Sequence, residues 1–208
     1  MTVLEKIASA QDVRSDQPNI DLAIELVEKE DQSAVAELVE ALKGKDKKVR
    51  NDCIKALYEI GYRKPEMIAP YVDDFLQLIM DRNNRLVWGS MIALSTIADL
   101  RSDEIYAQIS RVQRVFESGS VITQDAGMRV FAKIAVHSDA YSQALFPYLL
   151  GKLRTCRPQS FPQYAESTQI AVNEHNIEQF KQVLAQRKGD LNASQLKRVE
   201  KLERNLES

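Results

Sequence analysis

Apolar residues recur in this sequence at spacings of three and four, and the same sets return after 37 residues. Spacings of three and four place side chains on one face of an α-helix. The first set to recur comprises Val35, Leu38 and Leu42; Val72, Phe75 and Ile79; Ile109, Val112 and Phe116; and Phe146, Leu149 and Leu153. A period of this length predicts an array of similar structural repeats.

A second apolar set follows each copy of the first after a short break. Its members are Val49, Leu57 and Ile60; Leu86, Leu94 and Ile97; and Phe131 and Ile134. The fourth copy fits best one residue short, with Ile170 and Ala171 in the places of Ile134 and Ala135. The breaks carry Gly, Pro, Asn, Asp or Ser, and strand-like alternation is absent, so each repeat is predicted to be a helix pair in an all-α fold. Two first helices contain a proline, Pro70 and Pro147, which is expected to bend the helix or mark a late start.

The organisation predicted from this pattern is a single repeat domain over residues 1–208. Four repeats occupy residues 31–175, after an N-terminal cap at residues 1–30 with an amphipathic helix near 19–30. Two helices, near 176–186 and 193–206, are expected to cap the other end, because a terminal repeat otherwise leaves its apolar face in water. Val199, Leu202 and Leu206 can serve this cap or pair with a second chain, and the monomer is favoured.

The motifs of the second helices resemble those of the HEAT-repeat family, within the wider HEAT/armadillo-like class of α-solenoids. The polar turn and Val-Arg pair at residues 46–50 are followed by Ala56-Leu57 and Ile60-Gly61, and the proline-containing run at residues 68–76 is similar to the first helix of that family. The resemblance covers residues 31–135 well and fades in the fourth repeat. It implies a right-handed α-α superhelix whose second helices line a concave face. Members of the family act mostly as protein-binding scaffolds, while others bind nucleic acid and a few are enzymes.

A helical wheel of each second helix indicates which side chains face away from its buried stripe and therefore line the concave face. The partner-binding surface predicted in this way comprises Lys48, Asn51, Lys55, Tyr58, Tyr62, Trp88, Ile92, Asp125 and Arg129. Aromatic residues and arginine are enriched in interaction hot spots. The alternative for Trp88 is that it packs against the neighbouring repeat and only closes the stack.

Composition narrows the chemistry that the chain can perform. Charged residues make up 28% of the sequence and the formal net charge is −2, so the excess positive charge typical of nucleic-acid binding is missing. Cys53 and Cys156 are isolated, as are the two histidines, His137 and His175. No catalytic residue, cofactor or metal site is therefore expected. The absence of a signal peptide or a long apolar run predicts a cytoplasmic protein without membrane contact.

Two functional classes remain after these exclusions. The first is a non-enzymatic scaffold or adaptor whose concave face binds a segment of another protein. The alternative is a nucleic-acid-binding protein resembling the HEAT-like alkylpurine DNA glycosylases, to which Trp88, Asp125 and Arg129 bear a faint similarity. That alternative is disfavoured because a second tryptophan and a cluster of basic residues on one face are missing. Other roles, such as that of bilin-attachment helpers built on related repeats, stay open.

Overall fold

The computed structural model describes residues 2–206, which form helices and connecting turns without a strand. This confirms the predicted all-α class. The α-helices are α1 (Gln17–Lys29), α2 (Gln32–Ala41), α3 (Lys47–Arg63), α4 (Val72–Leu78), α5 (Asn84–Ile97), α6 (Ser102–Ala107), α7 (Ile109–Ser118), α8 (Val121–Ala135), α9 (Asp139–Thr155), α10 (Phe161–Thr168), α11 (Ile177–Arg187) and α12 (Ala193–Asn205). Short 3-10 helices lie between some of them, as at Pro65–Met67 and Ala69–Tyr71.

The chain divides into two compact bodies, one ending at Gly127 and the other beginning at Met128, so the division falls within α8. The prediction of one continuous repeat domain is not tested by this division and stays a prediction. Each body is described below by itself.

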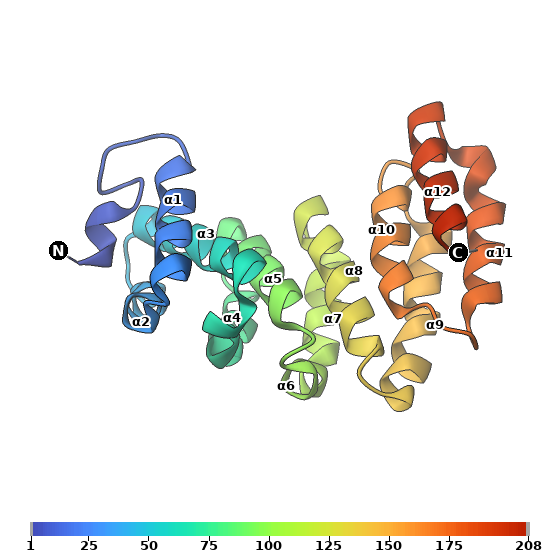
Figure 1. Ribbon diagram of the computed structural model, residues 1–208, viewed down its shortest axis with the longest axis horizontal. Helices are drawn as coiled ribbons and strands as arrows, with labels where there is room; N and C mark the ends of the chain where they lie inside the picture. The colour runs from blue at the N-terminus through green and yellow to red at the C-terminus, as the bar shows by residue number, and fades with distance from the viewer. Residues whose placement is uncertain (1, 207–208) are drawn as a thin grey trace. The chain divides into compact units, whose positions relative to one another are not determined.

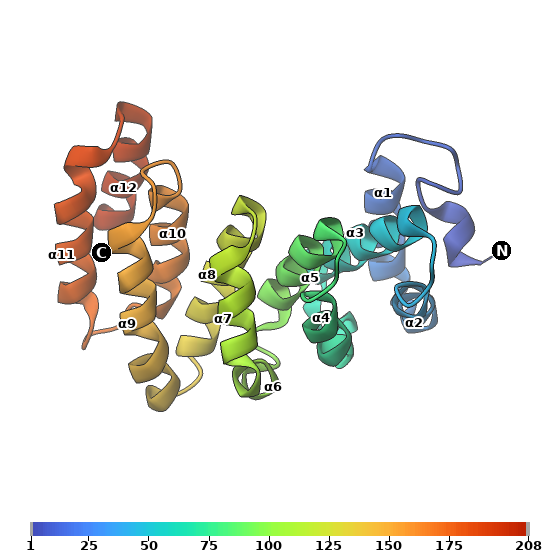
Figure 2. The ribbon, with the colours of Figure 1, turned by 180° about the vertical axis from the view of Figure 1, so that it is seen from behind.

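In the N-terminal body, α3 packs along α1 on one side and along α5 on the other, while α2 packs on α3 and α4 packs on α5 (Figures 1 and 2). The second helices thus form one layer and the first helices another. The predicted N-terminal cap supplies α1, which lies against α3 as a second helix lies against its neighbour. A 3-10 turn at Val3–Lys6 precedes it and packs on α2.

The second helices begin at polar residues that share the 37-residue period. Asp46 accepts hydrogen bonds from the backbone N–H groups of Lys48 and Val49, and Asn83 accepts one from that of Arg85. Ser120 accepts one from the backbone N–H of Thr123. Such N-caps satisfy donors that the first turn of a helix leaves unpaired. The second helices α3, α5 and α8 therefore begin at the same point of their repeats.

Proline marks a late start of one first helix and lies inside another. Pro70 lies in the 3-10 turn Ala69–Tyr71, and α4 begins only at Val72. Pro147 lies inside α9, which continues to Thr155. In the third repeat the first helix is divided into α6 and α7 near Gln108, where no proline is present.

In the C-terminal body, α10 packs on α9 and on α12, and α11 packs on α9 (Figures 1 and 2). Val199 and Leu202 of α12 are buried, as are Phe161 of α10 and Phe180 of α11. The two helices expected near the C-terminus are thus present and bury apolar residues within the chain. The capping role itself, like the oligomeric state, stays a prediction.

Most of the periodic apolar residues are buried, as expected. Val49 and Ile109 are half-buried, and Ile170 is 44% exposed, which contradicts the expectation for the fourth repeat. The reason is local: α10 ends at Thr168, and Ile170 lies in the 3-10 turn Gln169–Ala171, where the α-helical spacing no longer applies.

Candidate protein-binding surface

Three aromatic side chains from α3 and α5 form one cluster in the N-terminal body. The ring of Tyr58 lies 6.1 Å from that of Tyr62, edge to face, and 6.0 Å from that of Trp88. Tyr62 is 51% exposed, Trp88 is half-buried and Tyr58 is buried. These distances are those of favourable aromatic pairs. The cluster therefore has a fixed base, Tyr58, and two rings that reach the surface.

Cations flank this aromatic cluster. The guanidinium of Arg85 lies 5.6 Å from the centre of the Trp88 ring, and the ammonium of Lys55 lies 4.7 Å from that of Tyr58. The Lys55 ammonium also pairs at 2.7 Å with Glu59, which holds Arg63 at 2.6 Å. Cations over aromatic faces are attracted by the ring quadrupole. These contacts restrict the movement of rings that are partly in water.

Burial and ion pairing oppose one another at this site. Burial works against the charge of Glu59, but the hydrogen bonds from Lys55 and Arg63 prevail and lower the pKa of its carboxyl. At Lys55 burial opposes the charge, but the interactions with Glu59 and Tyr58 together outweigh burial and raise the pKa of the ammonium, while burial raises the pKa of the Tyr58 hydroxyl. The ion pairs are thus present at neutral pH, and Tyr58 is uncharged.

The wheel prediction was wrong about how far three of the residues are exposed. Lys55, Tyr58 and Ile92 are buried, at 9%, 6% and 9% exposure, although all three were expected to face outward. A wheel assumes one buried direction, whereas α3 has α1 and α5 on its two flanks, in addition to the first helix α2. Side chains beside the predicted stripe are therefore covered as well. Whether any of the nine residues binds a partner stays a prediction.

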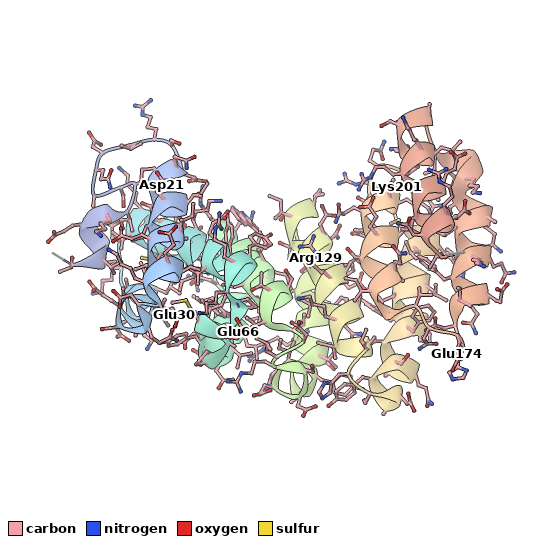
Figure 3. The ribbon with its side chains drawn as sticks, in the orientation of Figure 1. Asp21, Glu30, Glu66, Arg129, Glu174 and Lys201 are labelled. Atoms are coloured by element: carbon pink, nitrogen blue, oxygen red, sulfur yellow. The ribbon has the colours of Figure 1, made fainter. Side chains whose placement is uncertain are left out.

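The remaining predicted residues lie at the edge of the cluster or beyond it. Lys48 is exposed, and Asn51 is half-buried and accepts a 2.8 Å hydrogen bond from the Asn83 amide. Asp125 and Arg129 are both half-buried on α8, where Figure 3 labels Arg129. Asp125 belongs to the N-terminal body and Arg129 to the C-terminal body. Trp88 contacts Tyr58 of the preceding second helix and also keeps part of its surface in water. Contact with the neighbouring repeat and exposure on the surface therefore do not exclude each other.

Sequence reasoning missed a cavity beside this cluster. It has a volume of about 370 Å³, and its lining includes Arg85, Lys48 and Asn51 from the second helices and Ser9, Arg14 and Asp16 from the N-terminal segment. Arg85 was overlooked because the predicted surface was chosen around Trp88. The 37-residue period could have identified Arg85, because it follows the predicted surface residue Lys48 by 37 residues.

The N-terminal segment is held at the cavity by buried hydrogen bonds. Asp52 of α3 accepts bonds from the Ser9 backbone N–H at 2.8 Å and from the Asn19 amide at 2.9 Å. The Asn19 oxygen in turn accepts the backbone N–H of Ala8 at 2.9 Å. Farther along, Asp16 pairs with Arg85 at 2.7 Å. Residues that precede the first predicted repeat therefore form one wall of the cavity.

Groups that carry out chemistry do not gather at this surface. Within residues 2–206, no three side chains of the metal-ligating types come together. Cys53 is fully buried next to Asp52, and burial raises the pKa of its thiol to about 12, so it stays protonated. No helix in this part of the chain combines the length and the apolar content needed to cross a membrane.

No protein-family model matches the sequence, and no curated protein matches it. Solved structures do match. An engineered protein of the Northeast Structural Genomics Consortium aligns with 96% of this chain and 94% of its own, at a TM-score of 0.60 and 18% identity. A designed armadillo repeat protein aligns at a TM-score of 0.65 and 14% identity, over 86% of this chain and 84% of its own.

Another designed armadillo repeat protein, solved in complex with the peptide (KR)4, matches at a TM-score of 0.65 and 16% identity. That match covers 86% of this chain and 83% of the designed one. At such identity the likeness establishes the fold alone. The fold of the chain is that of a HEAT/armadillo-like helical repeat solenoid.

Proposed function

We propose that this chain is a non-enzymatic scaffold that binds a segment of another protein on the surface formed by its second helices. The observation that carries the proposal is the cluster of Tyr58, Tyr62 and Trp88. Rings that are ordered before binding and still partly exposed lose little conformational freedom when a partner covers them. A protein of the same fold in complex with a peptide adds support at the level of the fold.

The nucleic-acid alternative receives no comparable support. Carboxylates are interspersed with the cations around the cluster, as in the pairs of Asp16 with Arg85 and of Glu59 with Lys55. A phosphate backbone gains affinity from several cations on one face, each of which releases counterions. Both of these cations, Arg85 and Lys55, already have a carboxylate partner, which offsets part of their attraction for a phosphate.

The test is affinity capture from a lysate of the source cells, with proteins identified by mass spectrometry. The wild type is compared with a Tyr62→Ala, Trp88→Ala double variant, which leaves the buried Tyr58 in place. Tyr71→Ala is the matched control, because this tyrosine is half-buried in the first-helix layer, outside the cluster. Circular dichroism establishes that each variant is folded.

We expect one or more proteins to be captured by the wild type and by Tyr71→Ala and to be lost with the double variant, because the rings supply the contact area. Equal capture by all three proteins contradicts a role for the aromatic cluster. Recovery of nucleic acid that is abolished by nuclease and by salt supports the alternative class instead.

A further inference from the structure

The cavity beside the aromatic cluster has more unused donors than acceptors. Asp52 already accepts two hydrogen bonds, and Asp16 is paired with Arg85. Within residues 2–206, neither Lys48 nor Arg14 takes part in an ion pair, and neither do the Asp12 and Asp52 carboxylates, of which only Asp52 accepts hydrogen bonds. Formal charges in the lining balance, but the groups left to meet a ligand are mainly cationic donors.

Arg85 uses only part of its guanidinium. Its Nη2 donates to the Asp16 carboxylate at 2.7 Å, while its Nε is buried without a hydrogen-bond partner. A buried donor without a partner is unfavourable, and a guanidinium binds a carboxylate most strongly through two parallel bonds. The contact with Asp16 is therefore made through one nitrogen and is weaker than a two-bond pair.

Asp16 holds Arg85 from the residue before α1, through an ion pair that is partly exposed. It occupies the residue before α1, where an aspartate normally caps the helix, yet its side chain accepts no hydrogen bond from α1. The Asp16 and Arg85 side chains are 45% and 33% exposed, so water reaches both. An ion pair this exposed contributes little to stability. Its replacement by an external carboxylate requires no unfolding of the buried network at Asp52.

Lys48 and Arg85 stand at equivalent positions of successive repeats, 37 residues apart and two residues after the N-caps Asp46 and Asn83. Both line the cavity. A polypeptide that crosses the second helices meets both cations, with the Trp88 ring next to Arg85. Two cations beside an aromatic ring suit an acidic segment that also carries apolar residues.

We propose that Arg85 and Lys48 form a subsite that binds an acidic side chain of a partner polypeptide. In the absence of the partner, the Asp16 carboxylate pairs with the Arg85 guanidinium in its place. The inference rests on the proposed function, which it deepens by naming the charge of the partner. It sets this chain apart from the designed armadillo protein of the same fold that was solved with the basic peptide (KR)4.

The test measures the affinity of fluorescein-labelled peptides by anisotropy. The probe alternates glutamate and leucine, and two controls of equal length replace glutamate with glutamine or with lysine. We expect the wild type to prefer the glutamate peptide. Arg85→Gln and Lys48→Gln should each weaken this binding roughly tenfold, which is the effect of losing one charge-assisted contact. Lys47→Gln is the matched control, since Lys47 is exposed on the same turn but does not line the cavity.

Asp16→Asn is expected to change the affinity for the glutamate peptide in the opposite direction. Removal of the internal competitor should tighten binding of the glutamate peptide severalfold, because more of the free protein is then competent to bind. A structural role for Asp16 alone predicts no gain in affinity. Lys48→Gln keeps the test independent of folding, because Lys48 is exposed and unpaired.

The proposal is overturned if the glutamate peptide binds no more tightly than the glutamine peptide, if Asp16→Asn leaves its affinity unchanged, or if labelled duplex DNA binds more tightly through Arg85 and Lys48. Tyr62→Ala separates this failure from failure of the proposed function. Binding that depends on Tyr62 and not on Arg85 supports the aromatic surface and overturns the subsite. Binding that depends on Arg85 and not on Tyr62 supports the subsite and contradicts the aromatic surface.

Discussion

At the scale of single residues, Asp52 is a buried carboxylate that accepts two hydrogen bonds from the N-terminal segment. It is 8% exposed and accepts hydrogen bonds from the Ser9 backbone and from Asn19, which is fully buried. A buried polar network of this kind is stable only while each of its members has a partner. Asp52 therefore connects α3 to the segment that forms one wall of the cavity.

Replacement of Asp52 by alanine should destabilise the protein by about 1–3 kcal/mol, because the Asn19 amide is left buried without an acceptor. Urea unfolding measures the change. The matched control is Asp21→Ala on α1 (Figure 3), whose exposed carboxylate accepts from Gln17 and whose loss should change stability by less than about 0.5 kcal/mol. Similar values for the two variants would show that the network contributes little.

At the scale of helices, close approach between neighbouring second helices depends on small residues. A Cβ atom added at Gly89 of α5 would lie 2.7 Å from Cγ1 and 3.2 Å from Cγ2 of Ile54 on α3. Ile54 is branched at Cβ and fully buried, so these atoms have little freedom to move. The packing of α3 on α5 thus requires glycine at this position.

Gly89→Ala should therefore cost about 1–3 kcal/mol through overpacking, which exceeds the gain of about 0.5–1 kcal/mol in helix propensity. Gly151→Ala in α9 is the control, since nothing lies within 4 Å of the added Cβ and only the gain should be seen. Ile54→Ala removes the clashing atoms, so the double variant should lose less stability than the sum of the two single variants. A strictly additive result would contradict the clash.

The helices themselves were largely predictable, and the reason is their periodicity. The apolar period identified the helix pairs, and the polar residues Asp46, Asn83 and Ser120, which share the same period, cap their second helices. The exposure of the surface was less predictable. Tyr58 and Ile92 are buried because a stacked helix has neighbours on more than one side, a property that the wheel of a single helix does not contain.

At the scale of the whole molecule, the repeat pattern could not predict contacts between a repeat and a segment outside the repeats. Asp16 and Arg85 are 69 residues apart, and the segment that carries Asp16 belongs to none of the four repeats. The period predicts what one repeat presents to the next. It holds no information about where a non-repeating segment lies, so the cavity at Arg85 was not expected.

Repeat arrays are held together by contacts between neighbours, so a local loss of packing should stay local. Leu202 of α12 is 3% exposed, and Leu202→Ala should destabilise its surroundings by about 2–5 kcal/mol. Native-state hydrogen exchange should then show lost protection within residues 128–206, while amides of α1, α3 and α5 keep theirs. Lys201→Ala, at an exposed position of the same helix (Figure 3), should leave both regions unchanged. Equal loss throughout both bodies would instead mean that they unfold as one cooperative unit, which would contradict the expectation from neighbour contacts.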